Sequence, residues 1–176
     1  MPTTASQVGL DTLKLWVPLP GGRVGRLVGD QGRLRIPDVN IWAVILATLS
    51  TMVVGSIWYT PKVFGKRWMD LTGVNPADTN ASAVGPIIVT LVVSLITSYV
   101  LASLATISHE FYGGNFLSNT LLLAAMAWAG FTAARFITHD AFEGRPTALT
   151  TLNLGNELVT LLVMALIIGA FGAPGA

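Results

Sequence analysis

The chain has 176 residues, of which 52% are hydrophobic and 11% are charged, and its mean hydropathy is +0.65. Soluble domains carry about 25% charged residues, so this composition excludes an ordinary soluble protein and predicts a membrane protein. Ten Lys and Arg against nine Asp and Glu give a net charge of +1, which argues against nucleic acid as a partner, and the absence of cysteine excludes disulfides and thiolate chemistry.

Residues 1–40 are predicted to form an irregular N-terminal arm that is interrupted by glycine and proline and carries four arginines. Two interpretations stand side by side: an arm ordered by lipid head groups or by a partner, and a disordered, solvated tail. Polar and glycine-rich sequence follows the first residues instead of the apolar stretch of a signal peptide. The first apolar run is therefore expected to act as the insertion signal.

Four apolar runs follow the arm, each close to the roughly 20 residues that a helix needs to cross the hydrocarbon of a bilayer. They cover residues 41–59, 86–107, 116–138 and 150–171. The predicted fold class is all-α: a polytopic membrane protein in which four transmembrane helices form an antiparallel bundle over residues 41–172.

The first run has aromatic anchors at both ends, with Trp42 near its start and Trp58 and Tyr59 near its end. Pro61 is expected to stop this helix. The aromatic and basic residues that come next predict a short helix along the membrane surface. The interfacial motif consists of Trp58, Tyr59, Pro61, Phe64, Gly65, Lys66, Trp68 and Met69.

Small residues that recur at every fourth position predict the packing faces of the helices. In lipid, helices approach closely where their side chains are small. The residues singled out for helix packing are Gly55, Ser94, Ser98, Ala129 and Gly169.

Two ionisable residues fall inside the apolar runs, where a charge costs on the order of 2.5 to 3.5 kcal/mol. Arg135 and Glu157, together with Asn153 and Asn156, are predicted to form an intramembrane polar cluster, because a short loop places all four in the same half of the membrane. In one interpretation Glu157 binds a cation or a proton. In the other, Arg135 reaches the interface while Glu157 hydrogen-bonds within the bundle and locks it.

A loop motif separates the third and fourth runs and consists of His139, Phe142, Glu143, Gly144 and Arg145. One histidine beside carboxylates in a solvent-facing loop is a weak metal-binding pattern, so no metal and no other cofactor are predicted. The chain also lacks a nucleophile-and-base arrangement and a phosphate-binding glycine loop. We therefore expect no enzymatic activity and no catalytic residues.

Two segments resemble the motifs of a bacterial membrane family known as domain of unknown function 1761. Residues 55–69 (GSIWYTPKVFGKRWM) resemble its opening motif, and residues 138–146 (THDAFEGRP), followed by Leu152 and Asn153, resemble its second motif. The resemblance covers residues from about 40 to 172 and implies a four-helix integral membrane protein without an assigned activity. The last run departs from the family pattern, because Asn156 and Glu157 stand where an aromatic residue and a histidine are more usual.

Two functions are compatible with these features. The first is a non-enzymatic accessory or structural subunit of a larger bacterial membrane complex, whether respiratory, photosynthetic or for transport. The alternative is a small transporter or channel that uses the intramembrane polar cluster. Membrane lipids and other membrane protein subunits are the expected partners, with no nucleic acid, and the bacterial inner (cytoplasmic) membrane is the expected location of this multi-pass protein. Lys and Arg are nearly balanced between the two sides, which leaves the orientation open.

Overall fold

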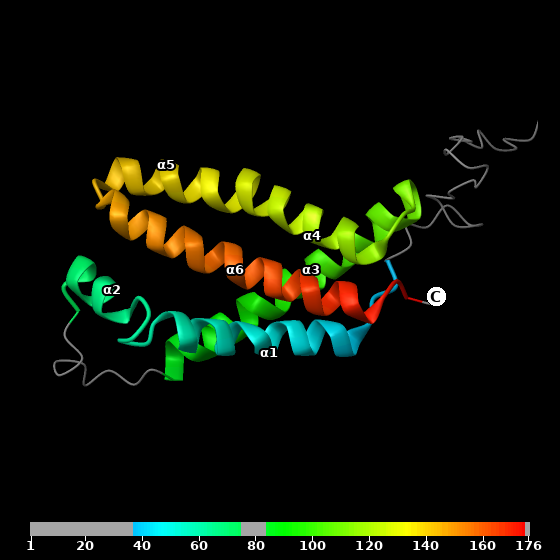
Figure 1. Cartoon of the computed structure of the whole chain (residues 1–176), viewed down its shortest axis with the longest axis horizontal. Helices are drawn as coiled ribbons and strands as arrows, with labels where there is room; N and C mark the ends of the chain where they lie inside the picture. Colours follow the sequence, from blue (N-terminus) through cyan, green and yellow to red (C-terminus); the bar gives the residue numbers. More distant parts are fainter. Residues whose placement is uncertain (1–36, 75–83, 175–176) are drawn as a thin grey trace, which may run out of the picture. The chain divides into compact units, whose positions relative to one another are not determined.

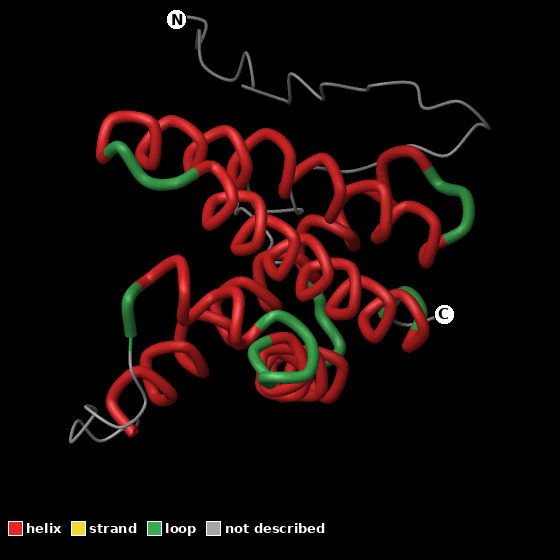
Figure 2. Tube along the Cα trace, turned by 60° about the vertical axis from the view of Figure 1, so that its left-hand side comes forward, coloured by secondary structure: helices red, strands yellow, loops and turns green. Residues whose placement is uncertain are grey.

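The computed structural model describes residues 37–74 and 84–174, and these belong to one compact unit, Ile36–Ala176. The described chain is helical apart from short loops (Figure 2). The predicted N-terminal arm lies outside the described residues except for residues 37–40.

Four helical segments are long and apolar enough to cross a membrane, namely Ile41–Trp58, Val84–Tyr112, Phe116–Glu143 and Thr147–Phe171. The prediction of an all-α protein with four membrane spans is thereby confirmed. The elements are α1 (Ile41–Trp58), α2 (Gly65–Thr72), α3 (Val84–Tyr112), α4 (Phe116–Ala127), the π-helix η2 (Trp128–Ala133), α5 (Ala134–Glu143) and α6 (Thr147–Phe171), without a strand in the described ranges.

Three of the four spans extend beyond their predicted ends. The second continues to Tyr112, the third continues to Glu143, and the fourth begins at Thr147. Apolar composition marks only the part of a helix that lies in hydrocarbon, and polar residues continue the helix until a breaker is reached. Gly113 and Gly144 supply that break, because both adopt positive φ angles of 69° and 66°, respectively, which glycine tolerates best.

Asn40 caps the start of α1 by accepting hydrogen bonds from the backbone N–H groups of Trp42 and Ala43 at 3.0 and 3.3 Å.

The corner between the other end of α1 and α2 is built tightly. There the backbone N–H of Gly65 donates to the carbonyl of Thr60 at 2.8 Å. A Cβ at position 65 would collide with the backbone of the preceding turn, so only glycine fits. The location of α2 on the membrane surface stays a prediction.

Helix α6 lies between α1 on one side and the segment α4–η2–α5 on the other, and α3 crosses behind α1 and α6 in the view of Figure 1. Helix α3 packs against both α1 and α4. The buried core is formed by Ala43, Val44, Ala47, Leu101, Ala102, Ala105, Phe116, Ala124, Leu161, Met164, Ala165 and Ile168.

The core is concentrated toward one end of the bundle. It uses the first half of α1, the second half of α3, Phe116 and Ala124 of α4, and the second half of α6. At this end the hydroxyls of Thr48 and Ser98 lie 2.8 Å apart, and Ser98 also donates to the carbonyl of Val44 at 3.3 Å. After Thr51, α1 contributes no buried residue, and neither do the first ten residues of α3. The two helices are therefore packed together along only part of their length.

Candidate functional site

A groove of about 560 Å³ lies where α1 and α3 are not packed together, and α6 contributes its third wall. Its lining consists of Thr51, Met52, Gly55, Ser56, Tyr59, Ile87, Val89, Thr90, Val93, Ser94, Thr97, Asn156, Glu157, Thr160, Leu161 and Met164. All three contributing helices are membrane spans, so the groove lies at membrane depth.

Hydroxyl groups give the groove its polar character. Thr51, Thr90 and Thr97 each donate to a backbone carbonyl of their own helix, at 2.8, 2.8 and 2.9 Å. Since the proton of each hydroxyl is already used, the oxygen presents only its lone pairs to other partners. These side chains are therefore hydrogen-bond acceptors.

Glu157 provides the charge of the groove. It is ten residues after Thr147, the first residue of α6, which places it about 15 Å along a helix that is about 37 Å long. No side chain in the described ranges forms an ion pair or a hydrogen bond with it. A carboxylate at this depth is costly, and no described side chain provides the counter-charge that would offset its burial.

Asn156 and Tyr59 lie beside this carboxylate in the groove wall. The Nδ2 atom of Asn156 is buried and has no hydrogen-bond partner among the described residues. The Tyr59 hydroxyl donates a long hydrogen bond of 3.4 Å to Oδ1 of Asn153. Partial burial raises the pKa of the Tyr59 phenol, and the charge of Glu157 raises it further. Tyr59 therefore keeps its proton at neutral pH and remains a donor.

The structure divides the four residues of the predicted polar cluster. Asn156 and Glu157 line the groove, and Asn153 is connected to the groove through Tyr59. Arg135 is exposed on α5 and forms no ion pair with any described carboxylate. It lies eight residues before Glu143, the last residue of α5, which is about 12 Å along the helix. Its distance from the end of its helix is thus similar to that of Glu157, but its side chain does not line the groove.

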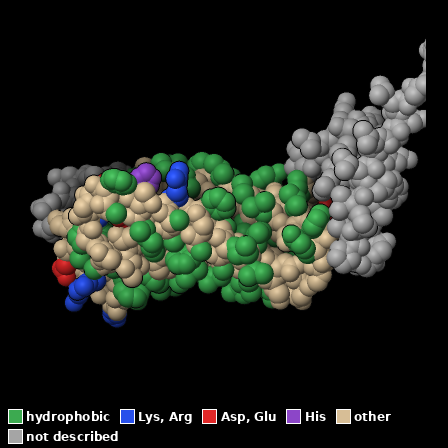
Figure 3. All heavy atoms as spheres, turned by 90° about the horizontal axis from the view of Figure 1, so that it is seen from above, with side chains coloured by type: hydrophobic (Ala, Val, Ile, Leu, Met, Phe, Trp, Pro, Cys, Tyr) green, Lys and Arg blue, Asp and Glu red, His purple; other side chains and the backbone are tan. Residues whose placement is uncertain are grey.

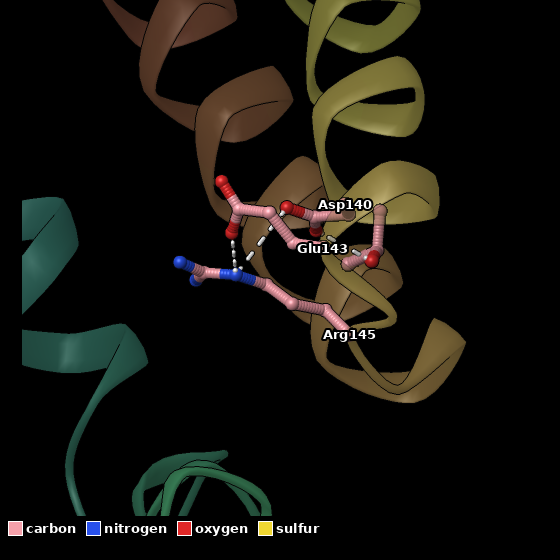
Figure 4. Close-up of polar contacts among 4 residues, drawn as sticks. Asp140, Glu143 and Arg145 are labelled. Atoms are coloured by element: carbon pink, nitrogen blue, oxygen red, sulfur yellow. Dashed lines mark hydrogen bonds and ion pairs between the residues drawn. The ribbon is translucent and has the colours of Figure 1, made fainter.

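Only part of the predicted loop motif lies in a loop: Gly144 and Arg145 belong to the connection between α5 and α6, whereas His139, Phe142 and Glu143 belong to the last turns of α5 (Figure 4). The helix continues through these polar residues as far as Gly144, whose positive φ ends it. Asp140 is buried and accepts a 2.6 Å hydrogen bond from the Thr150 hydroxyl, while its backbone carbonyl accepts from the N–H of Arg145 at 3.0 Å. The Arg145 Nε lies 2.6 Å from Glu143 and 3.8 Å from Asp140. His139 and Phe142 are exposed. In the described part of the chain, no three potential ligands gather into a metal site.

The interfacial motif holds α2 against the end of α1 through aromatic contacts. The rings of Trp58 and Phe64 have centroids 4.5 Å apart, and those of Tyr59 and Trp68 are 5.7 Å apart, edge to face. Lys66 is exposed, and Met69 is half-buried. Pro61 lies in the turn between the helices.

The five residues proposed for helix packing have different surroundings. Ser94 and Ser98 are buried, and a Cβ on Gly169 would collide with Leu117, so these three lie at close contacts between elements. Ala129 is exposed. Gly55 has open space beside it because it lines the groove.

The surface in Figure 3 is dominated by hydrophobic side chains, and most of its charged side chains gather toward the end that carries α2 and the α5–α6 loop. This distribution is the one expected where lipid surrounds the helices and water meets their ends.

These features define an all-helical, multi-pass membrane protein with a polar groove among its spans. Residues 42–169 match the family described as Protein of unknown function (DUF1761), and the chain belongs to that family. Comparison with curated proteins and with solved structures gave no match.

Two groups of residues in these sites were missed by sequence reasoning. The groove hydroxyls of Thr51, Ser56 and Thr160 were missed because threonine and serine are common in membrane helices and carry no distinctive spacing. The pair formed by Asp140 and Thr150 was missed as well. Its available signal was the aspartate that follows His139, ten residues before a threonine near the start of the next helix.

Proposed function

We propose that the protein is a small membrane transporter whose groove binds a positively charged ligand at Glu157. One observation carries the proposal: an intramembrane carboxylate lies in the wall of a groove, and no described side chain supplies a counter-charge. Ionisable groups at such depth are expensive and mark substrate or ion pathways. No chemical reaction is part of this function, and the proposed setting is the bacterial inner membrane.

The groove chemistry supports a cation over an anion. The hydroxyls of Thr51, Thr90 and Thr97 act as acceptors, and neither Lys nor Arg occurs among the residues that line the groove. Acceptor oxygens and one carboxylate stabilise positive charge and repel negative charge.

Flux measurements in proteoliposomes test the proposal. Vesicles are given external Na⁺, K⁺, tetramethylammonium or methyltriphenylphosphonium, uptake of the cation itself is measured with an isotopic label, and protein-free vesicles provide the leak rate. We expect uptake of at least one cation above the leak rate, and Glu157→Gln should reduce that uptake to the leak rate. Glu110→Gln is the matched control, because Glu110 is exposed near the end of α3 and does not line the groove.

Equal fluxes in wild-type protein, Glu157→Gln and empty vesicles for all four cations would overturn the transport proposal.

The same unpaired carboxylate supports a second proposal, an accessory subunit of a larger membrane complex. In that case a neighbouring subunit supplies the cationic side chain that meets Glu157. Extraction in a gentle detergent distinguishes the transporter from the accessory subunit. The subunit proposal requires that the protein migrate with a much larger complex and that Glu157→Gln weaken its association with that complex. Migration of the protein alone, or only as a small homo-oligomer, contradicts it.

A further inference from the structure

We infer that the ligand of the groove is an organic cation with an apolar body, and that Gly55 provides the space for that body. This inference rests on the proposed role of Glu157 as the cation site. It adds the chemical class of the ligand and names the residue that determines its size.

The volume of the groove is the first reason. A water-sized ion occupies about 30 Å³, whereas pockets that bind organic molecules have volumes of about 300 to 1,000 Å³. The groove measures about 560 Å³, so an inorganic ion or a proton at Glu157 would leave most of it to something else.

The walls of the groove are the second reason. Beside the acceptor oxygens lie the apolar side chains of Val93, Leu161 and Met164, and Met52 comes from the facing helix. Methionine is flexible and polarisable and adapts to apolar ligands of different shape. One carboxylate next to such walls matches a molecule that has a single positive charge and a hydrocarbon or aromatic remainder.

The surroundings of Gly55 are the third reason. A Cβ built at this position meets no atom within 4 Å, although the residue lies in a membrane helix and lines the groove. The free space beside Gly55 is thus part of the groove. A leucine there would place its Cβ in open space and extend its side chain into the groove, and leucine also favours a helix more than glycine does.

Ligand binding to the purified protein tests the inference. Methyltriphenylphosphonium and tetramethylammonium carry the same permanent charge, but only the first has a large apolar body. Isothermal titration calorimetry is performed on wild-type protein, Gly55→Leu, Gly130→Leu and Glu157→Gln. Gly130 is the matched control, since it is a membrane-helix glycine whose Cβ would also meet no atom within 4 Å and it does not line the groove.

We expect wild-type protein to bind methyltriphenylphosphonium at least about tenfold more tightly than tetramethylammonium, which corresponds to 1.4 kcal/mol. Gly55→Leu should weaken only the larger cation by about tenfold or more, Gly130→Leu should change neither affinity, and Glu157→Gln should abolish both. Equal affinity for the larger cation in Gly55→Leu and wild type overturns the inference, as does wild-type selectivity for the smaller cation.

The two proposals fail in different ways. If Na⁺ or K⁺ drives a flux that depends on Glu157 while methyltriphenylphosphonium does not bind, the ligand class is wrong and the transport function stands. If methyltriphenylphosphonium binds with the expected dependence on Gly55 and Glu157 but no cation causes a flux, the ligand class stands and the transport function is wrong.

Discussion

Asp140 is the single residue that most directly joins α5 to α6. Its buried carboxylate accepts the Thr150 hydroxyl at 2.6 Å, and its backbone carbonyl accepts the N–H of Arg145. The neighbouring Glu143 reaches only Arg145, and both of those side chains are about half exposed. The buried Asp140 and the exposed Glu143, both near the end of α5, should therefore differ in what they contribute to the free energy of unfolding.

Asp140→Ala is expected to destabilise the protein by about 1 to 3 kcal/mol, because it leaves the buried Thr150 hydroxyl without its acceptor. Glu143→Ala removes an exposed ion pair and should change stability by about 0 to 1 kcal/mol. Thermal unfolding in detergent, followed by tryptophan fluorescence, measures both. A larger loss for Glu143→Ala than for Asp140→Ala would show that the exposed ion pair, and not the buried hydrogen bond, stabilises the end of α5.

The contribution of Gly65 to stability depends on steric fit, because glycine has no side chain that could form a hydrogen bond. Gly65→Ala places a methyl group against the backbone of Tyr59 and Thr60, which cannot move without opening the turn, and should destabilise by about 1 to 3 kcal/mol. Gly85→Ala, where a Cβ meets nothing within 4 Å, should be neutral or stabilising by up to about 1 kcal/mol. The same unfolding measurement compares them, and equal midpoints would show that the turn can relax.

At the scale of the elements, the π-helix η2 determines which way α5 faces. A π-helical turn holds one residue more than an α-helical turn, and each residue of an α-helix turns the chain by about 100°. Residues after η2, including Arg135, are rotated relative to an unbroken helix. That Arg135 and Glu157 share a depth in the membrane stays a prediction; the sequence could not indicate the rotation, because no residue type marks a π-helix.

The side chain of Trp128 connects η2 to α6. Its Nε1 donates to the carbonyl of Leu154 at 3.1 Å. Trp128→Phe keeps an aromatic ring and removes this donor, so we expect a loss of about 0.5 to 1.5 kcal/mol in the free energy of unfolding. Trp42→Phe is the control, since the Trp42 ring is exposed at the start of α1. If both variants unfold at the same temperature, the hydrogen bond to α6 contributes nothing to stability.

At the scale of the whole molecule, the bundle is packed at one end and opens into a groove at the other. Four spans could be predicted because twenty apolar residues have one stable arrangement in lipid. Glu157 could be singled out because any charge in a span is costly. The groove walls opposite Glu157 are formed by α1 and α3, and their distance from it depends on where those two helices cross, which no local pattern encodes. Gly55 illustrates this, since its small size is compatible with a helix contact as well as with a groove.

Cysteine pairs can test the crossing of α1 and α3, because the chain contains no cysteine of its own. The pair Thr48→Cys and Ser98→Cys replaces hydroxyls that lie 2.8 Å apart and should oxidise readily to a disulfide. The pair Gly55→Cys and Thr90→Cys lies across the groove, where nothing comes within 4 Å of the Cβ at position 55, and should not. Loss of maleimide labelling after oxidation reports the disulfide. Rapid oxidation of the second pair would mean that the groove is closed.

Two of the three helices that line the groove, α1 and α3, differ in length, and this difference connects the width of the groove to the thickness of the bilayer. Helix α1 has 18 residues and α3 has 29, or about 27 and 43 Å, so in hydrocarbon about 30 Å thick only α3 has excess length to accommodate by tilting. Because α3 is fixed to α1 near Ser98, more tilt moves its first turns further from α1. Lipids with short acyl chains should therefore widen the groove, and lipids with long chains should narrow it. Affinity for a bulky cation would then report membrane thickness, which can be measured by repeating the binding experiment in nanodiscs of defined chain length.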